Sequence, residues 1–305
     1  MMEFWSKVLL LAVLFDIIFG EMPSHFHPVV WMGKLISRFV DTAPCRYRKL
    51  YGSSMVIFCV WITVLLARLL EFTGTGILGM VITAYFLKSS FSIRMLLISA
   101  IGIQKDLDSG MIEKVRRDLQ TFVGRDTSRL NSHQSASAVI ESLAESFVDG
   151  VLSPLFYFIL FGLPGALAYR MINTLDSMVG YKKEPFLELG YASAKLDDLA
   201  NWVPARISIM FLFIASIFSG KPFDSLRTSI QDHNKTASPN SGWAMAAVSG
   251  AMSVRLEKTG YHILGDKYQP PGTTHIRKTV FMISVSSFLV IGVIFFIGKI
   301  PLVPF

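Results

Sequence analysis

The strongest constraint on this chain is a series of apolar segments suited to a lipid bilayer. A helix of about 20 consecutive apolar residues is needed to cross the hydrocarbon core. Inside lipid every backbone polar group must be bonded internally, which favours helices over open sheets. The sequence therefore predicts an all-α, polytopic helical membrane protein with about four to six membrane segments. The apolar runs lie at 4–19, 53–70, 77–91, 151–171, 206–219 and 281–297.

Composition supports one integral-membrane domain over residues 1–305. Hydrophobic residues make up 52% of the 305 residues and charged residues only 17%, whereas soluble domains carry about 25% charge. The net charge of +7 fits cytoplasmic loops rich in Lys and Arg. Because no basic stripe with interleaved aromatic residues occurs, no nucleic-acid partner is expected. The two cysteines show neither disulfide nor metal spacing.

The segment 151–171 can be placed in the membrane in two ways. It contains Gly162-Leu-Pro-Gly165, and a proline flanked by glycines breaks a helix. A single span would place the turn at Gly124-Arg125-Asp126 and the polar cluster at 195–201 on opposite faces of the membrane. A re-entrant hairpin folded at Leu163-Pro164 would place both on one face, which is tolerated where its backbone is buried in protein. We favour the hairpin, and the single span remains the alternative.

Two helix boundaries follow from local signals. Ser132 or Ser135 is expected to cap a helix that reaches Asp149. A second helix is expected over 187–203, ending before Pro204 because a proline disfavours helical backbone at the residue before it. Polar and amphipathic helical segments of this kind, between the apolar runs, are expected to form the functional site.

Acidic residues recur at helical spacing on the first of these helices. Glu141, Glu145 and Asp149 step by four residues and share one face. Carboxylate oxygens in this arrangement suit Mg²⁺, which keeps several waters for phosphate ligands. A solvated helix face explains the same spacing without any ligand.

A second polar cluster directly precedes an apolar run. Asp197, Asp198 and Asn201 lie on one helical turn, and Lys195 is spaced to pair with Asp198. Intramembrane or membrane-edge groups of this kind are costly unless they serve a site. Metal or phosphate binding and a structural salt-bridge cluster are the two interpretations.

Amides and carboxylates also follow the glycine–proline break. Asn173, Asp176 and Ser177 lie at i, i+3 and i+4, and buried polar groups there must find partners. We therefore expect a network that they share with Asp197 and Asp198.

Isolated residues complete the candidate set. Arg125 can bind an anion or can pair with Asp126 to fix the turn, and Arg206 can clamp an anion or extend to lipid headgroups. Asn240 lies in a turn by composition. His25 and His27 have no third ligand at zinc spacing.

Six motifs occur in order along the chain. They are Val123-Gly-Arg-Asp-Thr127; Glu141-Ser-Leu-Ala-Glu145 with Asp149; Pro154-Leu-Phe156; Asn173-Thr-Leu-Asp-Ser-Met-Val-Gly-Tyr181; Ala194-Lys-Leu-Asp-Asp-Leu-Ala-Asn201 with Pro204-Ala-Arg206; and Ser238-Pro-Asn-Ser-Gly-Trp243. Together they resemble one known family, the adenosylcobinamide-phosphate synthases, which are membrane proteins of cobalamin biosynthesis. His27-Pro-Val29 near the N-terminus also fits the family's pattern, so the resemblance covers nearly the whole chain.

The resemblance implies an acid–amine ligase. Such an enzyme uses ATP and Mg²⁺ to join a carboxylate of the corrinoid adenosylcobyric acid to the amine of (R)-1-aminopropan-2-ol phosphate or a close amino alcohol phosphate. We expect Mg²⁺ at Glu145 and Asp149, or at Asp197 and Asp198. The expected catalytic residues are Glu141, Glu145, Asp149, Asp176, Lys195, Asp197 and Asp198. The expected substrate- and phosphate-binding residues are His27, Arg125, Asp126, Asn173, Asn201, Arg206 and Asn240.

Two other classes account for the same residues. A membrane phosphotransferase acting on a lipid-like substrate would also use Mg²⁺ and paired aspartates, and a transporter would line its path with intramembrane polar groups. Under the favoured interpretation the protein is multi-pass in the cell membrane, surrounded by lipid, with its site facing the cytoplasm because ATP is there. The sequence leaves open which amino alcohol phosphate is used and whether the protein forms a homo-oligomer.

Overall fold

The described part of the chain consists of helices joined by loops, with one short β-hairpin. A computed structural model describes residues 2–73, 76–123, 126–181 and 183–297. Within these, strand β1 (Leu256–Lys258) pairs antiparallel with β2 (His262–Leu264), with Glu257 opposite Ile263. Five helical stretches are long and apolar enough to cross a membrane, which confirms the predicted polytopic all-α fold. They are Arg48–Glu71, Gly76–Asp108, Ser132–Val179, Trp202–Ser219 and Thr273–Phe296.

The expected first span at 4–19 is not among these five stretches. It forms α1 (Met2–Phe19), whose sequence contains Glu3, Lys7 and Asp16. These charged residues make α1 less suited to lipid than the other apolar runs.

The described helices fall into two compact units that alternate along the chain. The crossings follow Ser92, Leu152, Asn201 and Val290. The expectation of one domain over residues 1–305 stays a prediction. The first unit holds α1, α2 (Pro28–Asp41), α3 (Arg48–Thr73), α4 (Gly76–Ser90), α8 (Ser153–Val179), α9 (Phe186–Leu189) and α10 (Tyr191–Ala200).

The second unit contains the remaining helices and the strand pair. Helix α14 (Thr273–Ile297) begins in this unit. The others are α5 (Arg94–Asp108), α6 (Ile112–Phe122), α7 (Ser132–Phe147), the π-helix η1 (Val148–Leu152), α11 (Trp202–Ser216), η2 (Ile217–Ser219), α12 (Pro222–Asp232), η3 (His233–Lys235) and α13 (Ser241–Met252).

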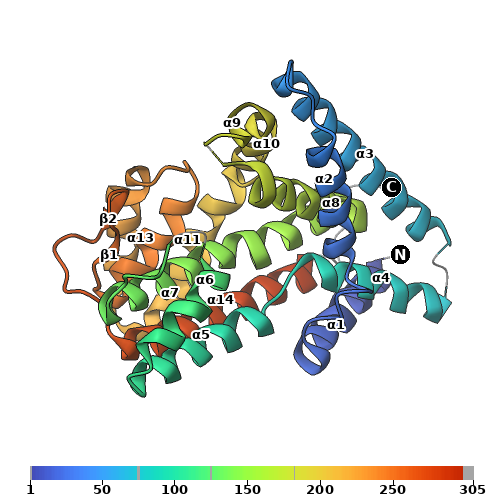
Figure 1. The fold of residues 1–305 in the computed structure, drawn as a ribbon. Helices are drawn as coiled ribbons and strands as arrows, with labels where there is room; N and C mark the ends of the chain where they lie inside the picture. The colour runs from blue at the N-terminus through green and yellow to red at the C-terminus, as the bar shows by residue number, and fades with distance from the viewer. Residues whose placement is uncertain (1, 74–75, 124–125, 182, 298–305) are drawn as a thin grey trace. The chain divides into compact units, whose positions relative to one another are not determined.

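Helix α8 of the first unit folds back on itself. The rings of Tyr157 and Tyr169 stack with centroids 5.4 Å apart, whereas a straight helix would separate two such positions by about 18 Å. The two arms of α8 are therefore antiparallel, as predicted for a hairpin at Leu163-Pro164. Helices α2, α3, α4 and α10 pack against it (Figure 1). That the hairpin is re-entrant in a membrane stays a prediction.

The bend of the hairpin is encoded locally. Gly162 has φ 67° and ψ −156°, a region that essentially only glycine adopts. The Leu163 backbone N–H donates to Glu71 Oε1 at 3.1 Å, which satisfies a free donor at the start of the second arm. Pro164 occupies the first turn of that arm, where no donor is required. Gly165 lets the arms touch, since a Cβ there would lie 2.4 Å from the Tyr157 carbonyl oxygen.

Two predicted helix boundaries are wrong. Neither Ser132 nor Ser135 caps α7. Instead Asn131 accepts from the Gln134 backbone N–H at 2.9 Å, while Gln134 Oε1 accepts from the Asn131 N–H at 3.0 Å. This reciprocal pair satisfies two donors, where a lone serine would satisfy one. The helix expected over 187–203 breaks at Gly190 and Asn201. Pro204 lies in the first turn of α11, which begins at Trp202, and does not end a helix.

Close backbone packing shapes the second unit. Helix α13 is rich in Ala, Gly and Ser, and it packs along α12. A Cβ at Gly250 would lie 2.2 Å from the Asp224 carbonyl oxygen, and one at Gly242 would lie 2.0 Å from the His233 carbonyl oxygen. The small residues of α13 therefore allow the two helix backbones to approach each other.

Replacing Gly162 by alanine should destabilise the protein by about 1–3 kcal/mol, because the side chain forces a backbone conformation that only glycine adopts easily. Gly102→Ala in α5 is the matched control, since nothing lies within 4 Å of its added Cβ. We expect that variant to be neutral or stabilised by about 0.5–1 kcal/mol. Unfolding of the purified proteins in detergent measures both; equal stability of the two variants would contradict the structure.

Candidate functional site

One buried asparagine closes the α8 hairpin. Asn201 is 2% exposed and follows α10. Its Oδ1 accepts from the Ser153 hydroxyl at 2.7 Å and from the Tyr169 hydroxyl at 2.9 Å. These two hydroxyls come from opposite arms of the hairpin. We call these three residues the Asn201 clamp.

The same asparagine holds a carboxylate. Asn201 Nδ2 donates to Asp197 Oδ2 at 3.0 Å, and Asn173 Nδ2 makes a long contact of 3.5 Å to Asp197 Oδ1. Asn173 in turn accepts from Arg170 at 3.3 Å. Both carboxylate oxygens therefore face amide donors, so the orientation of Asp197 is fixed by its surroundings.

Asp197 is also surrounded by negative charge. Burial raises the pKa of Asp197, and the nearby carboxylates of Asp176 and Asp198 raise it further. The hydrogen bonds from Asn201 and Asn173 oppose this increase only in part, and the pKa reaches about 7. The predicted network that joins the residues after the hairpin to those of α10 is thus present. We call Asn173, Asp176, Asp197 and Asp198 the Asp197 cluster.

Two predicted members of this region lie at its edge. The Lys195 side chain is exposed, and the ion pairs among the described residues do not include it, although the spacing suggested one with Asp198. Ser177 is exposed, and its hydroxyl donates to the Asn173 carbonyl oxygen at 2.8 Å. The catalytic role expected for Lys195 stays a prediction.

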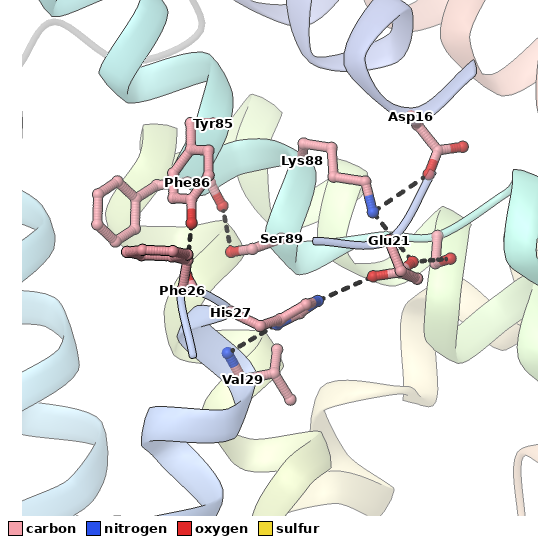
Figure 2. A network of polar contacts seen from close by, with 10 residues as sticks. Asp16, Glu21, Phe26, His27, Val29, Tyr85, Phe86, Lys88 and Ser89 are labelled. Atoms are coloured by element: carbon pink, nitrogen blue, oxygen red, sulfur yellow. Dashed lines mark hydrogen bonds and ion pairs between the residues drawn. The ribbon is translucent and has the colours of Figure 1, made fainter. Parts of the chain in front are cut away.

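A buried ionic network lies elsewhere in the first unit, around a lysine in the stretch Gly76–Asp108 (Figure 2). Lys88 is 1% exposed, and its Nζ lies 3.0 Å from Glu21 Oε1 and 3.4 Å from Asp16 Oδ1. Asp16 comes from α1, and Glu21 from the segment that follows it. Two carboxylates from one chain segment therefore hold an ammonium group that would otherwise be very costly in an apolar helix.

Both ring nitrogens of His27 form hydrogen bonds, and one of them joins His27 to this network (Figure 2). Its Nδ1 accepts from the Val29 backbone N–H at 3.2 Å and caps α2. The ring hydrogen must then lie on Nε2, which is 2.9 Å from Glu21 Oε2 and donates to it. The histidine was predicted to bind substrate; the structure places it as a helix cap that is tied to Glu21.

Glu21 is the centre of the network. Burial alone would raise its pKa, but hydrogen bonds from His27 and Ser92 lower it. The charge of Lys88 lowers it further, and the pKa falls to about 2. Glu21 is therefore ionised at neutral pH, with donors on both oxygens.

The acidic residues of the second unit do not form a uniform face. Glu141 is buried, Glu145 is exposed, and Asp149 is half-buried in the π-helix η1. Asp149 therefore lies in a wider turn than Glu141 and Glu145, which are on α7. Such π-turns occur frequently at functional sites.

Glu141 has partners that the spacing did not indicate. Ser137 donates to its Oε1 at 2.7 Å, and His262 Nε2 lies 3.5 Å from its Oε2. Ser137 also accepts from the Glu257 backbone N–H at 2.8 Å. The β1–β2 hairpin therefore positions both the serine and the histidine beside this carboxylate.

Arg206 lies among aromatic rings in the second unit. Its guanidinium is 4.2 Å from the Trp202 ring centroid and 5.3 Å from that of Trp243. It donates to the Trp202 carbonyl oxygen at 2.6 Å and contacts Asn240 Oδ1 at 3.4 Å. The structure thus brings two predicted residues together, Arg206 and the buried Asn240.

The predicted anion-binding turn is described only in part. Arg125 lies outside the described residues. Asp126 is exposed, and its Oδ1 accepts from the Ser128 backbone N–H at 2.9 Å. That hydrogen bond lowers the pKa of Asp126, and it fixes the turn without any ligand.

The predicted residues divide between the two units. His27, the Asp197 cluster, Lys195 and Asn201 belong to the first unit, whereas Asp126, the acids of α7 and η1, Arg206 and Asn240 belong to the second. A single site made from all of them stays a prediction. Within the described ranges no three His, Cys, Asp or Glu side chains are grouped closely enough to form a complete metal cage.

Sequence reasoning missed Glu21, Lys88, Ser92 and His262. Lys88 carried a usable signal, because it is a charged residue inside the apolar run 77–91. His262 carried none, since its proximity to Glu141 depends on a hairpin more than one hundred residues away in sequence.

Replacing Lys88 by methionine should cost about 3–5 kcal/mol, because it leaves the buried Asp16 and the half-buried Glu21 without their cation. Lys34→Met is the control, since Lys34 is exposed on α2 of the same unit, and it should change stability by less than about 0.5 kcal/mol. Adding Asp16→Asn to Lys88→Met should restore part of the loss. Thermal unfolding in detergent compares the four proteins, and a tolerated single Lys88→Met variant would refute the network.

The comparisons with known proteins agree on one family. The family model described as CobD/Cbib protein matches residues 9–283. The chain is 38% identical over 301 residues to the "Cobalamin biosynthesis protein CobD" of Dehalococcoides mccartyi, covering 95% of this chain and 97% of that protein. It is 41% identical over 267 residues to a "Probable cobalamin biosynthesis protein CobD" of Methanothermobacter thermautotrophicus, covering 85% and 86%. No solved structure matches the chain. The match covers most of the sequence and every predicted site residue, and the chain belongs to the CobD/Cbib family.

Proposed function

We propose that this protein is an adenosylcobinamide-phosphate synthase. It would join a carboxylate of adenosylcobyric acid to the amine of (R)-1-aminopropan-2-ol phosphate, or of a close amino alcohol phosphate, at the expense of ATP. Family membership over residues 9–283 carries the proposal, since this range includes all the candidate residues. The similar proteins are named for cobalamin biosynthesis, and the specific reaction is our inference.

Amide formation from a free acid needs two steps. A corrin carboxylate oxygen attacks the terminal phosphorus of ATP, which releases ADP and leaves an acyl phosphate. The amine nitrogen then attacks the acyl carbon, the C–O bond to phosphate breaks, and inorganic phosphate leaves. The attacking amine must lose one proton, so the site needs a base close to neutral pH.

Asp197 suits the role of this base. Its pKa of about 7, raised mainly by burial, is close to the value that suits a general base at physiological pH. Asn201 and Asn173 hold its carboxylate from the protein side, and each carboxylate oxygen retains a further lone pair for a substrate N–H.

The charge around Asp197 suits a cation. Asp176 and Asp198 both raise its pKa, so a bound cation would relieve a repulsion already present. Mg²⁺ binds through one or two carboxylates together with substrate phosphates, which fits this donor set. When bound, Mg²⁺ would offset phosphate charge. Glu145 with Asp149 would hold it if Asp197 is the base, because a cation on Asp197 would lower its pKa and occupy the oxygens that accept the proton. Asp198 with Asp197 are the alternative ligands, and the base would then be another group.

The remaining residues have proposed roles in binding. Arg125 and Arg206 would bind phosphate oxygens with their forked guanidinium groups. Asn240, Asp126 and His27 would orient substrates. Glu141 would have the catalytic role that the resemblance implies, together with Glu145 on α7. We place the protein in the cell membrane with the site facing the cytoplasm, where ATP is available.

A reconstituted assay tests the reaction directly. The purified full-length protein is supplied with adenosylcobyric acid, aminopropanol phosphate, ATP and Mg²⁺, and the products are identified by mass. We expect adenosylcobinamide phosphate to form with one ADP per amide. ATP use without the corrinoid acid, or phosphate transfer to a lipid, would indicate a phosphotransferase. Binding without any turnover would favour a transporter.

Asp197→Asn should lower kcat by about 10²–10⁴-fold if Asp197 is the general base. In the unchanged protein kcat should fall about tenfold per pH unit below pH 7 and level off above it, because the acid form cannot accept a proton. If Asp198 binds Mg²⁺, Asp198→Asn should raise the Mg²⁺ concentration needed for half-maximal activity. If Glu145 binds it, Glu145→Gln should do so instead.

Glu188→Gln is the control for these variants, since Glu188 is exposed on α9 of the same unit. Near-normal turnover in Asp197→Asn, with an unchanged pH profile, would remove Asp197 from the mechanism. Near-normal turnover and Mg²⁺ dependence in both Asp198→Asn and Glu145→Gln would remove both metal assignments.

A further inference from the structure

A pocket in the second unit is lined by none of the residues that have a role in the proposed reaction. It has a volume of about 370 Å³, within the size range of ligand sites. It lies where two of the candidate membrane stretches end, at the close of Trp202–Ser219 and in the first turns of Thr273–Phe296. Its walls come from α11, η2, α13 and α14. The ends of spanning helices are where lipid headgroups meet a membrane protein.

The pocket carries positive charge that no carboxylate offsets. Lys221, Arg277 and Lys278 line it, and its lining contains no acidic residue. Lys221 donates to the Ser253 hydroxyl at 2.8 Å. Among the described residues none of the three cations forms an ion pair. Three like charges around one cavity repel each other, and an anion bound there would relieve that repulsion.

Two exposed aromatic rings and Ser219 also line the pocket. The rings of Phe218 and Phe281 meet edge to face with centroids 6.0 Å apart, and the two residues are 69% and 55% exposed. Small and flexible apolar side chains, including Ala251 and Met282, complete the walls. Free phosphate gains nothing from contact with apolar walls. The glycerol and acyl chains of a lipid can bury apolar surface against them.

We propose that this pocket binds the phosphate headgroup of an anionic phospholipid. The phosphodiester would contact Arg277 and Lys278 at the start of α14, with Lys221 opposite, and the acyl chains would pass along Phe218 and Phe281. The site is independent of the proposed ligase reaction, and its test measures binding rather than turnover.

The experiment measures lipid binding by the purified full-length protein in detergent, using native mass spectrometry. The probes are dioleoyl phosphatidylglycerol, dioleoyl phosphatidylcholine and inorganic phosphate. Phosphatidylglycerol should bind more tightly than phosphatidylcholine. Arg277→Gln with Lys278→Gln should weaken phosphatidylglycerol binding roughly 30-fold. Each cation near an anionic headgroup should contribute roughly five- to sixfold to the affinity, and the two factors multiply.

Two controls separate charge at the pocket from general effects. Arg227→Gln with Lys267→Gln removes the same charge from exposed positions of the same unit outside the pocket, and should leave binding unchanged. Arg277→Lys keeps the charge and should bind within a few-fold of the unchanged protein. All variants are checked by thermal unfolding.

Several results would overturn the proposal. One is equal binding of the two lipids. Another is an equal effect of the pocket and control variants. If inorganic phosphate binds on its own and displaces the lipid at millimolar concentration, with the same loss in the pocket variant, the site is one for free phosphate and the lipid assignment fails.

Discussion

The first unit depends on one amide side chain, that of Asn201. Its carbonyl oxygen joins Ser153 and Tyr169 from the two arms of α8, and its NH₂ group orients Asp197. A buried amide that lost these partners would cost about 1–3 kcal/mol for each unsatisfied group. The hairpin and the carboxylate are thus coupled: the fold-back that brings the arms together also positions the group we propose as the base.

The ionic network around Lys88 also consists of buried polar groups that need partners, but here the groups carry full charges. An ammonium inside a candidate span is acceptable only with carboxylates close by, and Asp16 and Glu21 provide them. The chain preceding α2 must therefore run beside α4, and His27 fixes it by capping α2 while bonding Glu21. Within the first unit, these polar contacts tie α4 to the segment between α1 and α2, and α10 to both arms of α8.

Much of this was predictable where the signal is local. The Gly162–Pro164 break predicted a fold-back, because one residue needs glycine-only backbone and the other cannot continue a helix. The spacing of Asn173, Asp176 and Asp197 predicted a shared network. Predicted helix boundaries were wrong where contacts with other helices determine them. Asn201 rather than Pro204 ends the α10 segment, because the Asn201 side chain hydrogen-bonds to α8. The contacts of Lys88 and His262 join segments distant in sequence, which one sequence cannot reveal.

The central claim, that α8 is a closed hairpin, is tested by a distance. A double variant, Tyr157→Cys with Tyr169→Cys, is made in a background in which Cys45 and Cys59 are replaced by serine. The purified protein is treated with a short bifunctional thiol reagent, and the cross-link is measured by peptide mass. Stacked rings 5.4 Å apart place the two positions within reach of such a reagent and predict efficient cross-linking within the chain. An absent cross-link, with spin labels at the same positions about 18 Å apart as in a continuous helix, would contradict the account.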